Sequence, residues 1–119
     1  MSVNLAVVRG HLTSPPEVRI LPSERELAVL QITTRPSSEA AISVPVAVWD
    51  PPAWLADLDA GAELVAVGTV RRRFFRAGAA TASRVELEAT YVARAGDRRK
   101  VDAARRRVHA ALEGLDEPA

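Results

Sequence analysis

The chain has 119 residues with 16 basic and 15 acidic side chains, a size and balance that predict one compact domain. It contains no cysteine, which excludes disulfides, thiol nucleophiles and cysteine-based zinc sites. The longest stretch without a charged residue, Ala40 to Trp49, has about half of the ~20 apolar residues that a membrane-spanning helix needs. The N-terminus also lacks the pattern of a secretion signal. We therefore expect a cytoplasmic protein with no membrane partner.

The first third of the chain reads as short strands separated by turns. An apolar run over Val3 to Val8 is closed by Gly10, and Glu17 to Leu21 alternates polar and apolar residues as a half-buried strand does. Leu27 to Thr34 alternates as well. Its better core face carries Ala28, Leu30, Ile32 and Thr34.

A further strand and a short helix are predicted next. Ile42 to Trp49 alternates again and contains Pro45, which predicts a sheet edge or a bulge because proline cannot donate to a ladder. A helix is expected between Asp50, as its N-cap, and Gly61, as its stop signal. We expect Trp54, inside this helix, to pack in the core.

A hairpin follows the helix. Leu64 to Phe75 is predicted as a long strand with a bulge or sharp bend at Gly68. Ala77 to Ala80 is predicted to form the turn, and Ser83 to Val92 the returning strand. The predicted fold class is therefore all-β, with five strands and a short helix between the third and the fourth.

Beyond Gly96 the apolar residues recur with helical period. An amphipathic helix is expected from Asp97, its N-cap, to Leu115. We divide the chain into a domain over residues 1–95 and a basic helical extension over residues 96–119. Three interpretations of the helix stay open: a solvated face with a docking stripe, a helix that pairs with its copy in an oligomer, and a nucleic-acid-binding extension.

Charge is unevenly divided along the chain. Residues 1–63 carry a net charge of −4 and residues 64–119 a net charge of +5. No acidic residue stands between Glu63 and Glu86, and a second basic block runs from Arg94 to Arg107. The acid-free interval holds five arginines, Arg71, Arg72, Arg73, Arg76 and Arg84. Arginine favours planar bidentate contacts with anions, although codon bias in a GC-rich genome gives the same preference.

Motifs of catalysis are missing from the sequence. The two histidines, His11 and His109, lie in different predicted elements. No glycine-rich phosphate loop, serine nucleophile elbow or zinc-protease motif is present. We therefore expect no enzymatic activity, no cofactor, no metal site and no small-molecule substrate.

Aromatic residues next to arginines are the strongest functional signal. Phe74 and Phe75 point to opposite faces of a strand, so they cannot both fill one core, and one of them is expected to face out. In a regular strand Phe75 shares its face with Arg71 and Arg73, which gives an aromatic plate beside two cations. This arrangement suits single-stranded nucleic acid, and the alternative is a subunit interface. Trp49 is either a second stacking platform or a plug under the following helix.

Three segments resemble bacterial single-stranded DNA-binding proteins. Asn4 to Arg19 is similar to the opening strand and following turn of that family, Val46 to Trp49 to its third strand, and Gly61 to Arg71 to its fourth. The resemblance covers residues 3–93. It implies a five-stranded oligonucleotide-binding (OB) barrel that binds single-stranded DNA without strong sequence preference, in replication, recombination or repair.

The resemblance also implies a set of contact residues. Trp49 and Phe75 fall at stacking positions of the family, whereas Ser43 stands where the family has a second stacking tryptophan. The chain lacks the family's acidic tail, so the recruiting role of that tail is not implied. The residues expected to contact DNA are Trp49, Phe75, Arg71, Arg73, Arg76, Arg84, Arg9 and Arg35.

We expect a nucleoid-associated dimer or tetramer whose partner is single-stranded DNA. The alternative is an assembly module with weak or no nucleic-acid binding, similar to primosome accessory proteins.

Overall fold

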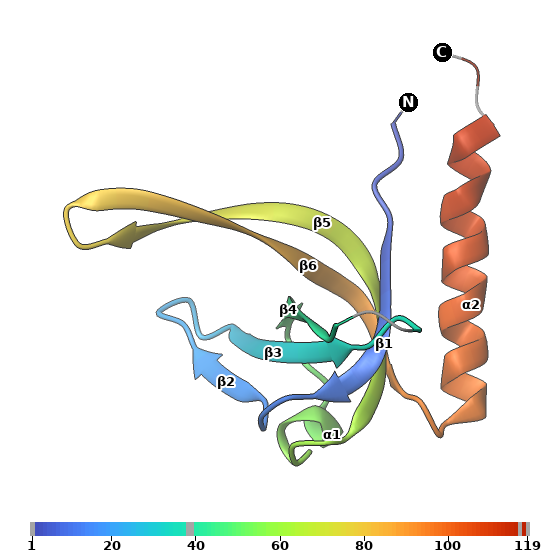
Figure 1. Ribbon diagram of the computed structural model, residues 1–119, viewed down its shortest axis with the longest axis horizontal. Helices are drawn as coiled ribbons and strands as arrows, with labels where there is room; N and C mark the ends of the chain where they lie inside the picture. The colour runs from blue at the N-terminus through green and yellow to red at the C-terminus, as the bar shows by residue number, and fades with distance from the viewer. Residues whose placement is uncertain (1, 38–39, 117, 119) are drawn as a thin grey trace.

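The protein folds into one curled β-sheet with a long helix beside it, seen in a computed structural model that describes residues 2–37, 40–116 and 118 (Figure 1). Residues 1, 38, 39, 117 and 119 lie outside the described part. In chain order the elements are β1 (Ala6–Leu12), β2 (Glu17–Ile20), β3 (Glu26–Thr34), β4 (Ile42–Trp49), α1 (Ala53–Ala56), β5 (Glu63–Ala77), β6 (Ala80–Arg94), α2 (Arg98–Leu112) and the 3-10 helix η1 (Glu113–Asp116).

Five of the strands close into a ring. The order across the sheet is β1-β5-β6-β4-β3-β2, and β1 also pairs with β3, which joins the two sides. Neighbouring strands are antiparallel except β4 and β6, which run parallel where Val46 to Val48 face Leu87 to Ala89. The prediction of an edge strand or bulge at Pro45 is wrong, because β4 lies between β3 and β6 and Pro45 pairs with Gln31 in regular register. Proline is tolerated there because the pairing with β6 begins only at Val46. The predicted all-β class holds in the coarser form of a mostly-β fold with a C-terminal helix, but the sheet has six strands rather than five, and α1 follows the fourth strand rather than the third.

Alternate residues of the ring strands fill its interior. Ala28, Leu30 and Ile32 are buried as predicted, and Thr34 is half-buried at the strand end. Leu55 of α1 is fully buried and covers one end of the ring. Since side chains alternate between faces, the remaining residues of each strand form the outer surface.

β2 stands outside the ring and pairs only with β3. All four of its residues are exposed, so the prediction of a half-buried strand here is wrong. The physical reason is that no second layer covers β2, whereas the ring strands bury their inner face.

Two glycines allow close contacts between strands. Gly10 lies inside β1, so the prediction that it closes the strand is wrong. At this point β1 turns from its partner β5 towards β3. A Cβ atom on Gly10 would overlap the carbonyl oxygen of Thr33 in β3. Gly68 marks the predicted bulge, because the pairing of β5 with β6 shifts register between Val67 and Gly68. A Cβ atom at Gly68 would overlap the backbone of Glu88.

Beyond Val70 and its partner Leu87, which still pairs with β4, β5 and β6 leave the ring as a two-stranded arm (Figure 1). Both strands are longer than predicted, and Gly78 at the tip has the positive φ of 65° that a tight turn favours. Phe74 is 68% exposed and Phe75 43% exposed. Phe75 is therefore exposed as predicted, and Phe74 is exposed as well, because the arm has no core to receive either ring.

The helix after β4 is also shorter than predicted. α1 has a single turn, its N-cap is Pro52, and no side chain caps it. Asp50 is not the N-cap: its backbone N–H continues the pairing of β4 with Glu26 of β3, and its carboxylate pairs with Arg25. Trp54 packs partly against the edge of the core, which confirms the core prediction in part.

α2 docks on the outer face of β5. Its N-cap is Asp97, as predicted, and the Asp97 side chain accepts a hydrogen bond from the backbone N–H of Lys100. The apolar stripe packs on the chain's own sheet, which favours the docking interpretation of this helix. The second core cluster contains Val65, Val67 and Ala104, with Leu5, Tyr91, Val101 and Val108 packed against it.

Candidate nucleic-acid interface

A hollow of about 510 Å³ lies at the root of the arm, on the outer surface of the ring. Three parts of the chain build it: the start of β3, the end of β4 and the inner half of the arm. Its lining residues are Arg25, Trp49, Arg71, Arg72, Arg73, Phe74, Glu86 and Glu88. Cations and aromatic rings therefore meet in one concave site.

Trp49 faces this hollow because β4 alternates between core and surface. Val48 is buried, so its neighbour Trp49 points outward, and it is half-buried. The Arg25 guanidinium lies over the indole, with its Cζ atom 4.6 Å from the ring centroid. Arg25 also donates from Nη2 to Asp50 Oδ2 at 2.9 Å. Both contacts hold the indole at the surface. Trp49 therefore does not fill the space beneath α1, which is filled by the helix's own Leu55.

Two arginines of the hollow pair with carboxylates across the hairpin. Arg73 Nε lies 2.6 Å from Glu86 Oε1, and Arg71 Nε lies 3.4 Å from Glu88 Oε2. Arg84 Nη2 stands 4.0 Å from the second oxygen of Glu86. The interval without acids in the sequence is thus partly neutralised in space by the returning strand.

This neutralisation was missed at the sequence level, although a signal was present. The predicted turn at residues 77–80 fixes the antiparallel register of the arm, and that register places Glu86 opposite Arg71. Arg25, Arg72 and Phe74 were missed as well. Phe74 reaches the hollow from the other face of β5 because two-stranded ribbons twist strongly.

The structure brings together only some of the predicted contact residues. Trp49, Arg71 and Arg73 line the hollow, and Arg84 approaches it through Glu86. Phe75 shares the face of Arg71 and Arg73, as predicted, because the register is regular beyond Gly68. It lies further along the arm, followed by Arg76.

The other two predicted residues lie elsewhere. Arg9, on β1, forms an ion pair with Glu63 at 3.0 Å and lines a separate hollow beside α2. Arg35 is exposed directly after the end of β3. Neither residue lines the hollow beside Trp49.

Titration and metal binding add little to this site. The Arg19 guanidinium, through a hydrogen bond and its charge, lowers the pKa of Glu17 below the ordinary value, but both residues lie on β2. Within residues 2–37, 40–116 and 118, no group of three or more His, Cys, Asp or Glu is placed to hold a metal ion. No helix in that part of the chain has the length and apolar character to cross a membrane.

Comparisons with family models of proteins and with curated proteins found no match to this chain.

Proposed function

We propose that the protein has an OB fold and binds single-stranded DNA without strong sequence preference. An OB fold is a five-stranded, partly open Greek-key barrel that binds oligonucleotides on its second and third strands and on the loops after its first and fourth. With β1, β3, β4, β5 and β6 as the five strands, the hollow lies between the second and third strands and the arm. This location supports the proposal.

The observation that carries the proposal is the composition of the hollow beside Trp49. A base stacked on the indole or on Phe74 contributes about 1–3 kcal/mol, and every base offers such a face. The arginines around the rings neutralise phosphates independently of sequence. Arg72, whose Nη1 donates to Ser83 Oγ at 3.0 Å, has no carboxylate partner among the described residues. We therefore assign stacking to Trp49 and Phe74, with Phe75 extending the surface along the arm, and phosphate binding to the arm arginines.

Tryptophan fluorescence tests this proposal directly. In the variant Trp54→Phe, Trp49 is the only tryptophan, and its emission is expected to be quenched by oligo-dT of about 16 nucleotides, the upper end of the site size of one OB fold. High salt is expected to reverse the quenching. Unchanged emission, together with no binding by anisotropy of a labelled oligonucleotide at low salt, would refute DNA binding.

Phe75→Ala separates binding from folding. Since Phe75 is 43% exposed, its removal is expected to weaken DNA binding by about 5- to 100-fold while thermal unfolding stays nearly unchanged. Loss of the folded state in this variant would instead make Phe75 a structural residue.

The second candidate function is self-assembly, as a dimer or tetramer. A hollow of about 400 Å³ with an apolar lining lies at the other side of the arm root. Four of its residues, Val7, Ile42, Val70 and Val85, are each about half exposed. Such exposed apolar clusters mark interaction surfaces, and a second copy of the chain is the occupant we test. Sedimentation of the wild type and of Val85→Asp is expected to show an oligomer that the variant loses.

A further inference from the structure

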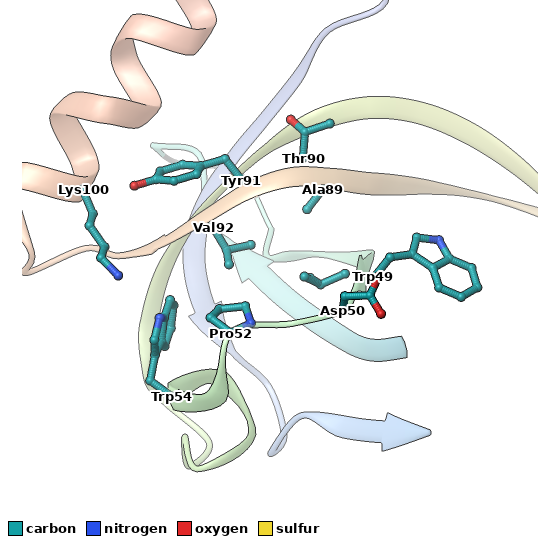
Figure 2. A pocket seen from close by; sticks show the side chains of 10 residues that line it. Trp49, Asp50, Pro52, Trp54, Ala89, Thr90, Tyr91, Val92 and Lys100 are labelled. Atoms are coloured by element: carbon teal, nitrogen blue, oxygen red, sulfur yellow. The ribbon is translucent and has the colours of Figure 1, made fainter. Parts of the chain in front are cut away.

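Trp49 separates two hollows on the outer surface. On the side away from the arm lies a second hollow of about 310 Å³, which runs from Trp49 to the beginning of α2. Figure 2 shows the two indoles at its opposite ends, with Tyr91 and Lys100 near Trp54. Pro52, Thr90 and Val92 also line this hollow.

Trp54 carries two cations on its ring. The Arg94 Cζ atom lies 4.9 Å from the ring centroid, and the Lys100 Nζ atom lies 5.6 Å from it. Beyond Trp54 a small hollow of about 90 Å³ continues between Arg94, Lys100 and Asp97. The outer surface thus holds three successive hollows, and each neighbouring pair shares a tryptophan.

The acids beside this path are already engaged. Asp50 pairs with Arg25, and the Asp97 side chain caps α2 through the backbone N–H of Lys100. Lys100 and Arg94 themselves form no ion pair among the residues that the structure describes. They differ in this from Arg71 and Arg73, which are held by carboxylates. The cations at Trp54 are therefore the more available partners for an anion.

We propose that a single strand of DNA bound beside Trp49 continues through the second hollow, where a base stacks on Trp54 in place of a cation that now covers the ring, and Lys100 and Arg94 turn to bind the flanking phosphates. This inference rests on the proposed function and extends its site. It makes α1 and the first turn of α2 part of the binding surface. A strand long enough to reach Trp54 gains contacts that a short strand at the arm does not make.

The two tryptophans allow each end of the path to be followed separately. In Trp49→Phe, which keeps an aromatic platform, Trp54 is the only reporter. We expect oligo-dT of about 15 nucleotides to quench Trp54 emission at saturation, and oligo-dT of about 5 nucleotides to leave most of it unchanged. In Trp54→Phe, both oligonucleotides are expected to quench Trp49.

Lys100→Ala tests whether the Lys100 ammonium group binds a phosphate, and it leaves the core intact because Lys100 is exposed. For the longer oligonucleotide, the slope of log K against log salt concentration is expected to become shallower by about 0.7, the contribution of one phosphate contact. The slope for the shorter oligonucleotide is expected to stay the same. Arg106→Ala is the matched control, since Arg106 is exposed on the same helix and lines none of the three hollows.

The contrary outcomes are distinguishable. If the long oligonucleotide binds and quenches Trp49 in one variant but leaves Trp54 unchanged in the other, the extended path is wrong and the proposed function stands. If dTMP alone quenches Trp54 as strongly as the long oligonucleotide, the second hollow is an isolated nucleotide pocket and the path is wrong. If the wild-type protein binds no oligonucleotide at low salt, the proposed function itself fails.

Discussion

Glu86 is the most buried charged residue of the described chain, with 4% of its surface exposed. A carboxylate at such a position is costly unless cations compensate it, and Arg73 and Arg84 do so from both strands of the arm. Glu86 therefore fixes the side chain of Arg73 at the entrance of the hollow. Glu88 holds Arg71 in the same way, but over a longer distance and with greater exposure.

Glu88→Gln is expected to strengthen DNA binding. The substitution keeps the shape of the side chain and releases the Arg71 guanidinium, so one more phosphate can be neutralised and the salt slope steepens by about 0.7. The free energy of unfolding is expected to change by less than about 1 kcal/mol, because Arg71 is largely exposed. Fluorescence titration over a salt series and thermal unfolding measure the two effects.

Glu17→Gln is the control for this prediction. It removes a carboxylate that is paired with Arg19 on β2, away from the hollow, and is expected to leave the salt slope unchanged. If Glu88→Gln binds no more tightly than Glu17→Gln does, Arg71 does not contact the phosphates.

The arm depends on one glycine where it leaves the ring. Gly68→Ala is expected to lower the free energy of unfolding by more than about 2 kcal/mol, because the added Cβ meets the backbone of Glu88 and not a side chain that can move. Gly96→Ala is the control: nothing lies within 4 Å of its added Cβ, so the change is expected to stay within about 1 kcal/mol. Chemical denaturation measures both, and equal stabilities would contradict the close approach.

Helices and strands whose bounds depend only on residues within or next to them could be predicted from the sequence. β4 begins and ends where its alternation does, and Asp97 caps α2 through a contact three residues away. The bounds of α1 could not be predicted, because Asp50 is a capping residue by type, whereas in the fold its backbone extends the pairing of β4 with β3 at Glu26. The exposure of β2 was missed for the same reason: alternation shows which faces differ, but not whether another layer covers one of them.

The same distinction applies to the candidate site. The outward face of Trp49 and the shared face of Phe75 and Arg71 follow from strand alternation. The pairing of Arg71 with Glu88 depends on the register of β5 with β6, and the place of Arg25 over Trp49 depends on the register of β3 with β4. Alternation within one strand does not give these registers.

The whole molecule carries a net charge of only +1, so its attraction for DNA depends on where the charges lie. The arm and α2 stand on opposite sides of the ring (Figure 1), and each carries a group of arginines. Acidic side chains form ion pairs with some of these arginines, for example with Arg71 and Arg105. The strength of salt dependence therefore reports how many cations remain for phosphate.

The last prediction is the value of that dependence. Outside the carboxylate pairs at Arg71, Arg73 and Arg84, four cations stand along the path from the arm to α2: Arg72, Arg76, Arg94 and Lys100. At about 0.7 per phosphate contact, a long oligo-dT is expected to give a slope near −2.8 in log K against log salt concentration. A slope of about −5 would mean that phosphates displace Glu86 and Glu88 from their three arginines. A slope of about −1.4 would confine binding to the arm, and a slope of about zero would contradict phosphate binding altogether.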